Sequence, residues 1–428
     1  MNFIKKHQLL SVSTLALAIA ASNATAGGFE KATLWDAKYS ALAGAAVSSV
    51  DDSSAIFFNP AGLAFAESND IALHLSPTFT KVNGPAGGSD TYIEGENNFV
   101  PSSGFTGLYK LNEKFTMGYG VYASGGASAS YEGVTVGQNI GPYSSKTGDY
   151  STTISIVEAG LAMAYRINNN WSVGGTYRIT YAAADINLMS ATGPAGASIQ
   201  YNDMSGFEYF GVRLGAMYRS DDNKFGWGIN YRSEVSIDAD GNYKADIGAP
   251  APIGGKTSGN VTASTMLPTQ VSVGMDYAIT HGWTIFNEVT WSNYENIDAI
   301  KFTGDDSLPI THINTGWNNQ INVRFAGEYT GIEGWALRGG YILTLPVVPE
   351  ELAAPTFSTP ANAHTITFGA GTTVMEGKVD LDFAAEYNYA KNEDVSGGGT
   401  QTNTGTKSPS GKYRTSAYAF HVSAKYKF

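Results

Sequence analysis

The chain has 428 residues and a net charge of −12, with 50 glycines, 25 tyrosines, no cysteine and only 15% charged residues. An acidic chain is a poor partner for nucleic acid, and the absence of cysteine excludes disulfides, thiolate catalysis and cysteine-ligated metal sites. Its mean hydropathy of −0.15 argues against membrane helices, but it leaves a transmembrane β-barrel open because barrel strands alternate between apolar and polar residues.

The N-terminus predicts a secretion signal. Lys5 and Lys6 form a basic head, residues 9–21 are mildly apolar, and residues 24–26 (Ala-Thr-Ala) resemble a cleavage site. The apolar run is too short to span a bilayer, which disfavours the alternative of a membrane anchor. We therefore expect residues 1–26 to be a signal peptide that is removed on export.

Residues 27–68 lack a strand pattern. Small apolar residues fill positions 40–47, Asp51 or Asp52 is placed to cap a short helical turn, and Pro60 disfavours a central strand. The segment is too apolar to be a solvated tail. We expect it to form a plug, or hatch, inside a barrel lumen. The alternative is a periplasmic arm that docks elsewhere.

Apolar and polar residues alternate along residues 69–428. In the last strand Tyr418 and Phe420 fall on one face, while His421 and Lys425 fall on the other. Together with the aromatic C-terminus, this pattern predicts an all-β fold, a transmembrane antiparallel β-barrel of about 14 strands. The expected strands are 69–82, 99–111, 114–125, 150–167, 171–188, 204–220, 223–238, 259–279, 283–302, 317–330, 335–344, 363–375, 378–391 and 412–428.

The connections between these strands alternate in length. Even-numbered strands are followed by tight turns, and odd-numbered strands by long loops rich in Gly, Ser, Thr, Asn and Pro. This asymmetry is typical of barrels in the cell outer membrane of a Gram-negative bacterium, with the short side periplasmic. A propeller is disfavoured because no sequence unit recurs. The expected long loops are 83–98, 126–149, 189–203, 239–258, 303–316, 345–362 and 392–411.

The segment before the first strand resembles a known family. Residues 40–46 (Ser-Ala-Leu-Ala-Gly-Ala-Ala), 51–54 (Asp-Asp-Ser-Ser) and 59–63 (Asn-Pro-Ala-Gly-Leu) are similar to the hatch of the FadL/TodX family of outer-membrane transporters of long-chain fatty acids and hydrocarbons. That family carries an Asn-Pro-Ala motif at this place. The residues of the motif in this chain are Asn59, Pro60 and Ala61.

The resemblance implies a monomeric barrel of fourteen strands, a hatch that closes the lumen, and uptake of long-chain fatty acids or other hydrophobic compounds. The ligand would pass from the extracellular loops to a lumen site beside the hatch, and leave laterally into the membrane at a kinked third strand. Outer-membrane lipid and lipopolysaccharide are the expected surroundings. The candidate kink residues in this chain are Gly118, Gly120, Gly125 and Gly126.

A fatty-acid site needs an apolar tunnel and a cation for the carboxylate. Phe57 and Phe58, beside the Asn-Pro-Ala turn, are candidates to line the tunnel. Alternation also places arginines on the inner face, and one or two of them are expected to hold the head group: Arg166, Arg178, Arg213, Arg232, Arg324 and Arg338. The alternative is a structural network with the inward acids Glu158, Glu234, Asp276, Glu288, Glu328, Asp382 and Glu386.

Other functional classes have weaker support. The chain lacks the nucleophile elbow, zinc-protease, phosphate-loop and dinucleotide motifs, so we expect no enzyme activity. Its histidines have no metal-ligand spacing, and we expect no cofactor. A general diffusion porin, or an adhesin or receptor that acts through the long loops, is the remaining alternative. A porin would have an open lumen, which the apolar segment before the first strand disfavours.

Overall fold

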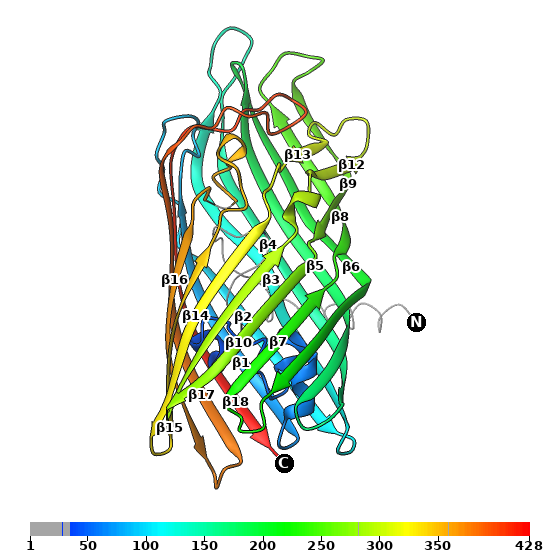
Figure 1. Cartoon of the computed structure of the whole chain (residues 1–428). Helices are drawn as coiled ribbons and strands as arrows, with labels where there is room; N and C mark the ends of the chain where they lie inside the picture. Colours follow the sequence, from blue (N-terminus) through cyan, green and yellow to red (C-terminus); the bar gives the residue numbers. More distant parts are fainter. Residues whose placement is uncertain (1–27, 29–34, 281, 358) are drawn as a thin grey trace.

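The computed structural model describes residues 28, 35–280, 282–357 and 359–428, and it forms a tall closed β-barrel (Figure 1). The predicted signal peptide lies outside the described residues. Within the described part of the chain, no helix is both long and apolar enough to cross a membrane. The all-β antiparallel fold predicted from the sequence is confirmed.

Fourteen strands make up the wall of the barrel in the described residues. Ten of them are continuous: β1 (Asp70–Asn83), β2 (Asn98–Lys110), β3 (Phe115–Val136), β4 (Lys146–Arg166), β5 (Trp171–Thr192), β6 (Ala195–Arg219), β15 (Trp335–Thr344), β16 (Ala363–Val374), β17 (Val379–Val395) and β18 (Gly411–Lys427). The other four are each interrupted once: β7 (Phe225–Arg232) with β8 (Val235–Ile247), β9 (Gly255–Leu267) with β10 (Gln270–Thr280), β11 (Trp283–Ser292) with β12 (Ala299–Gly304), and β13 (His312–Asn314) with β14 (Gln320–Ile332).

The barrel closes where the first and last strands meet. β1 pairs antiparallel with both β2 and β18, and Ile71 lies opposite Tyr426 in the latter ladder. Closure leaves no free sheet edge, which is the condition for a sheet to cross a bilayer. The predicted alternation is also confirmed, because Tyr418 and Phe420 are exposed on the outer surface and His421 is buried inside.

Three of the predicted long loops are wrong, because the strands run further than their apolar pattern does. β3 continues to Val136, β5 and β6 are joined by residues 193–194 alone, and β8 continues to Ile247. Beyond the membrane the outer face of a strand meets water, so it no longer needs apolar residues. The alternation that marks a strand in the sequence therefore disappears before the strand itself ends.

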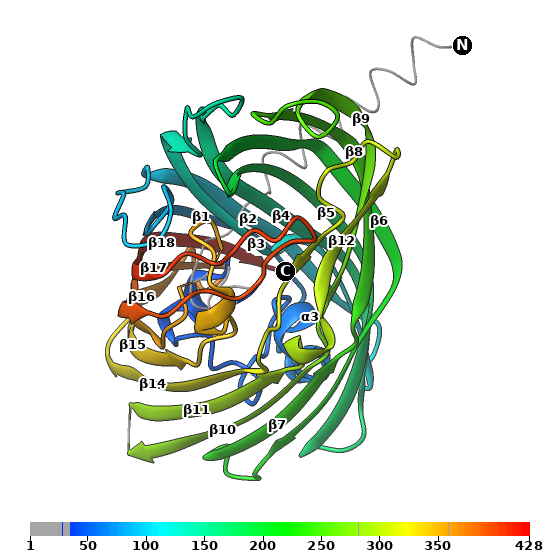
Figure 2. The same cartoon turned by 90° about the horizontal axis from the view of Figure 1, so that it is seen from above.

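The N-terminal segment, residues 35–68, lies inside the barrel (Figure 2) and in its lower part (Figure 1). It contains helix α2 (Ala37–Ala41), helix α3 (Ala55–Phe58) and the 3₁₀ turn η1 (Pro60–Phe65). Asp36 caps α2 by accepting from the backbone N–H of Tyr39 at 3.2 Å, and the predicted cap residue Asp52 accepts from the N–H of Ser54 just before α3. Two further 3₁₀ turns, η2 (Tyr294–Asn296) and η3 (Glu350–Leu352), lie in the extracellular half.

Glycines on the inner wall make room for this segment. A Cβ on Gly215 of β6 would meet the carboxamide oxygen of Asn59, and a Cβ on Gly228 of β7 would meet the backbone of Val47. At Gly174 of β5, a Cβ would lie 2.5 Å from the carbonyl of Pro60. The backbone of the N-terminal segment therefore touches the barrel wall directly, at places where any side chain would separate them.

We predict that Gly215→Ala displaces Asn59 and destabilises the barrel by about 1–3 kcal/mol, as overpacking of a tight interior does. The measurement is the temperature at which the barrel unfolds, read in detergent gels from the disappearance of the band of the compact, folded form. Gly175→Ala is the matched control, because a Cβ there would lie 3.4 Å from Leu214 and 3.7 Å from the carbonyl of Arg213, both ordinary contacts. Equal midpoints for the two variants would contradict the prediction.

Candidate functional site

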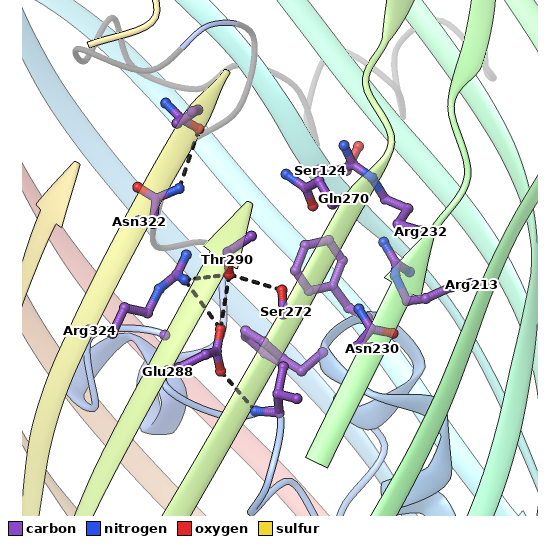
Figure 3. A pocket seen from close by; sticks show the side chains of 15 residues that line it. Ser124, Arg213, Asn230, Arg232, Gln270, Ser272, Glu288, Thr290, Asn322 and Arg324 are labelled. Carbon is purple, nitrogen blue, oxygen red and sulfur yellow. Dashed lines mark hydrogen bonds and ion pairs between the residues drawn. The ribbon is translucent and has the colours of Figure 1, made fainter. Parts of the chain in front are cut away.

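A cavity lies in the lumen against the N-terminal segment (Figure 3). Its volume is about 60 Å³, which is room for a few water-sized groups. Phe57, Phe58, Gly44 and Val47 form the wall contributed by the N-terminal segment. The barrel contributes the polar wall: Ser124, Arg213, Asn230, Arg232, Gln270, Ser272, Glu288, Thr290, Gln320, Asn322 and Arg324.

Arg213, on β6, joins the cavity to the N-terminal segment. Its Nη1 donates to the carbonyl of Ile56 at 3.1 Å, and its guanidinium lies 4.6 Å from the centre of the Phe57 ring. Its Nη2 lies 3.3 Å from a carboxylate oxygen of Glu158. The side chain is only 1% exposed. Arg213 therefore contacts the aromatic wall, the backbone of the N-terminal segment and an inner-wall acid at once.

Arg324 also connects the cavity to the N-terminal segment, on the opposite side and through Glu288. Its Nη1 lies 3.2 Å from Oε1 of Glu288 and donates to Thr290 at 2.7 Å. The other oxygen of Glu288 accepts from the backbone N–H groups of Ala46 and Val47, both at 3.0 Å. One buried carboxylate thus holds both a cavity arginine and the turn that precedes α3.

Arginines outnumber acids around the cavity. Arg178 lies beside it on β5, fully buried, with Nη2 3.7 Å from Glu158. Among the described residues, the three guanidinium nitrogens of Arg178 have no hydrogen-bond partner. In the described part of the chain, Arg178 and Arg213 share the single carboxylate of Glu158. Burial makes an excess of positive charge unfavourable, so the site is suited to an anion.

A second, wholly apolar pocket begins on the extracellular side of this charged cluster. On β4, Ile156 lies two residues from Glu158 toward the extracellular end and points inward. Ile156 and Ile154 line the pocket. On the far wall Leu267 lines it, and the next residue, Pro268, accepts a hydrogen bond from Arg232 at 3.0 Å. The remaining lining is Ala182, Ala183, Ala184, Ile186, Met204, Ile237, Ala239, Ala263, Thr265 and Ile300.

Two predicted arginines lie elsewhere. Arg166 lies near the periplasmic mouth with its guanidinium 5.4 Å from the ring of Phe65, and it lines a separate vestibule under the N-terminal segment. Arg338 forms ion pairs with Glu328 and Asp382 at 2.7 and 2.5 Å. Arg338 therefore belongs to the kind of structural network that the sequence allowed as the alternative.

Ionic contacts also hold the N-terminal segment to the last strand. Asp52 lies 2.9 Å from Lys425 of β18, and Lys38 of α2 lies 3.1 Å from Asp51. Burial alone would raise the pKa of the Asp52 carboxyl, but Lys425 and Lys38 outweigh it and hold that pKa below its usual range. Asp52 therefore stays ionised at any physiological pH.

The Asn-Pro-Ala motif lies at the centre of the docking. Asn59 is completely buried, and its Nδ2 donates to the carbonyls of Val47 at 2.8 Å, Ala216 at 3.2 Å and Ile229 at 3.3 Å. Its Oδ1 accepts from the N–H of Ala61 at 3.1 Å and so caps η1. Pro60 occupies the first position of η1, where its missing N–H leaves no bond unmade.

The third strand is irregular where the resemblance placed a kink. The ladder between β2 and β3 begins at Lys110 and Thr116 and ends at the rung of Gly104 and Tyr122. Further along β3, the hydroxyl of Ser130 donates to Asn98, the first residue of β2, at 2.9 Å, and its carbonyl accepts at 2.8 Å from the N–H of Glu96, which precedes β2.

The four candidate kink residues fall on both sides of that last rung. Gly118 and Gly120 lie within the regular ladder. Gly125 and Gly126 lie above it, where the register with β4 shifts, and Gly126 has a φ of 145° that favours glycine. A local departure from regular pairing therefore exists in β3.

Sequence reasoning missed Trp35 and Tyr122. Trp35 is fully buried, and its ring stacks on Tyr122 with 5.0 Å between centroids. A Cβ on Gly104 would lie 2.9 Å from the same indole, so Trp35 covers the last rung between β2 and β3. Ser124, two residues further along β3, points its buried hydroxyl at the cavity. No local pattern marks these residues, because their neighbours come from distant parts of the chain.

Fold and site together define a transmembrane β-barrel transport protein with an occupied lumen. The family described as outer membrane protein transport protein (OMPP1/FadL/TodX) matches residues 17–428, and the chain belongs to this family. Its members are transport proteins of the Gram-negative outer membrane, which is therefore the location of this barrel.

Known relatives agree with this assignment. The long-chain fatty acid transport protein of Escherichia coli O6:H1 is 24% identical over 59% of this chain, and the match spans 63% of that protein's length. A FadL homologue from Pseudomonas aeruginosa superposes with a TM-score of 0.77 at 14% identity, covering 94% of this chain and all of the other. The toluene transporter TodX of Pseudomonas putida gives 0.67 at 15% identity, covering 93% and 99%. Both solved structures support the fold.

We predict that Asn59→Asp loosens the N-terminal segment. A carboxylate cannot donate to the three carbonyls that Asn59 now satisfies, and buried unmet acceptors cost about 1–3 kcal/mol each. Hydrogen exchange followed by mass spectrometry should show faster exchange across residues 46–62. Asn187→Asp removes one donor bond on the barrel wall and is the control. Unchanged exchange in the Asn59 variant would count against this role.

Proposed function

We propose that this chain takes up long-chain fatty acids or similar hydrophobic anions across the outer membrane, as a monomer. The observation that carries the proposal is the arrangement of the lumen, in which a cation-rich cavity lies directly below a wholly apolar pocket. A fatty acid has the same division into a charged head and an apolar chain. The order of the two sites also matches a ligand that enters from the extracellular loops with its head group foremost.

The charge balance favours an acid over a neutral hydrocarbon. A neutral hydrocarbon could not balance the charge of the buried guanidinium groups of Arg178 and Arg213, which share the one carboxylate of Glu158 among the described residues. A carboxylate would supply the missing negative charge where water is excluded and ionic contacts are strong. Arg213 and Arg324 are the proposed ligands of the head group, with Phe57 and Phe58 beside the first methylene groups.

We propose that the N-terminal segment acts as the hatch. Its backbone is tied to the wall through Asn59 and Glu288, and its side chains form one apolar cluster with inward residues of the barrel. A general diffusion porin needs an open aqueous path, so this packing favours the transporter over that alternative. Arg213 and Glu288 contact both the cavity and the hatch, which supplies a route from head-group binding to hatch movement.

Exit is proposed to occur sideways between β2 and β3. The ladder ends there beside the cavity residue Ser124, and Trp35 of the hatch lies over its last rung. A ligand that leaves between the strands would enter the membrane without crossing the hatch. Movement of the hatch would shift Trp35 and so uncover this point.

Binding should depend on the carboxylate through Arg213. We predict that Arg213→Gln weakens binding of a long-chain fatty acid roughly tenfold, the size of one lost charge-assisted contact. Binding of the alcohol of the same chain length should stay nearly constant. Arg166→Gln, inside the barrel but outside the cavity, is the control. Equal losses for acid and alcohol would point to general damage and would contradict the proposed head-group site.

Closing the gap between β2 and β3 should stop release. We predict that Ser103→Cys/Ala123→Cys, the positions just beyond the last rung, abolishes fatty-acid uptake by cells when the two thiols are linked, and that reduction restores it. Binding to the purified barrel should persist. Phe105→Cys/Val121→Cys links strands that are already paired and should have no effect. Normal uptake by cells in which the Ser103→Cys/Ala123→Cys variant is fully linked would refute lateral exit at this place.

A further inference from the structure

Basic side chains gather on the outer surface of the barrel at the extracellular ends of β17 and β18. Lys391 of β17 and Lys412 and Arg414 of β18 surround the single carboxylate of Glu393. Lys391 and Arg414 contact its Oε1 at 2.8 and 2.6 Å, and Lys412 lies 3.5 Å from Oε2. We call Lys391, Lys412 and Arg414 the basic triad. Three cations therefore share one acid in these ion pairs.

The surroundings hold the basic triad in a fixed geometry. Arg414 also lies over the ring of Tyr92, with 5.8 Å from its guanidinium carbon to the ring centre. The nearby Lys81 of β1 is already paired with Glu94 at 2.7 Å. Two further acids at this end of the barrel, Asp90 and Asp394, form no ion pair among the described residues. The three side chains of the triad stay 39–57% exposed and open to the outside.

The level of the basic triad along the strands coincides with the edge of the membrane. On β18 the outward residues from Phe428 back to Tyr418 are largely apolar or aromatic. That stretch rises about 33 Å along the strand, or about 25 Å after a barrel tilt, which is the height of the lipid-facing band. Arg414 lies about 10 Å further out, at the level of lipid head groups.

Aromatic residues mark the same boundary on the neighbouring strand. Tyr387, Tyr389 and Tyr418 lie next to one another just below the triad, with Tyr387 4.8 Å from Tyr418 and 6.5 Å from Tyr389 between ring centres. Tyrosine belts form where the apolar core of a membrane meets its head groups. The basic triad therefore begins where the tyrosines end.

We propose that the basic triad binds the phosphate groups of a phosphorylated glycolipid in the outer leaflet, the lipid part of lipopolysaccharide. Guanidinium and ammonium groups bind phosphate through charge-assisted hydrogen bonds, and three of them converge here around a single carboxylate. The acyl chains would lie along the apolar outer faces of β17, β18 and β1. Other faces of the barrel differ in charge, because the outward side of β8 carries three acids, Asp238, Asp240 and Asp246, and one base, Lys244.

Titration of the mature barrel in detergent with a defined bisphosphorylated glycolipid tests this site, with the bound lipid counted by native mass spectrometry. The variant Lys391→Gln/Lys412→Gln/Arg414→Gln should bind the lipid roughly tenfold less tightly or worse. The matched control Lys244→Gln/Lys256→Gln/Lys301→Gln removes the same charge from exposed lysines on β8, β9 and β12 and should bind like the original chain. Fatty-acid binding in the lumen should stay the same in both variants.

Each comparison has an outcome that would overturn the proposal. Equal weakening in the triad variant and in the control would mean that only net charge matters. If the original chain bound the dephosphorylated glycolipid equally well, the phosphates would not be the groups that it recognises. If it bound phosphatidylglycerol equally well, it would have no preference for the glycolipid. Loss of fatty-acid binding in the triad variant alone would identify damage to the fold. Selective loss of the phosphorylated glycolipid in the triad variant supports the site.

Discussion

The buried carboxamide of Asn59 ties three separate parts of the chain to one point. Its nitrogen donates to Val47 in the N-terminal segment and to Ala216 and Ile229 in two barrel strands. Inside the packed lumen these bonds form away from water, so they fix the segment against both strands. The close approach that the bonds require is possible because the facing wall residues are glycines. The position of the N-terminal segment, and everything it shapes, depends on this contact.

Because the lumen is filled, the charges within it act at short range and without water. Arg213 and Arg324 each bind an acid, and each also contacts the N-terminal segment directly or through Glu288. In an open pore the same arginines would be solvated and weakly coupled. Packing by the N-terminal segment therefore converts a set of inner-wall arginines into one enclosed, arginine-lined cavity next to an apolar pocket.

The outer surface follows a different physical rule, set by the membrane rather than by packing. Apolar residues, tyrosines and basic residues succeed one another along β17 and β18 as the surroundings change from hydrocarbon to head groups. The inner face changes independently, since alternate residues of one strand point to opposite sides. One strand can thus carry a lumen site and a lipid site without conflict between them.

The sequence by itself determined the barrel and its number of strands, because lipid on one face imposes a period of two along each strand. It also indicated that Phe57, Phe58 and the inward arginines lie within the lumen. Only the tertiary structure separated Arg213 and Arg324 from Arg166, and only it brought Trp35 onto Tyr122. Strand pattern fixes which face a side chain takes, whereas register, closure and the packed N-terminal segment decide which side chains meet. Those contacts join residues that are far apart in the chain, and no local pattern encodes them.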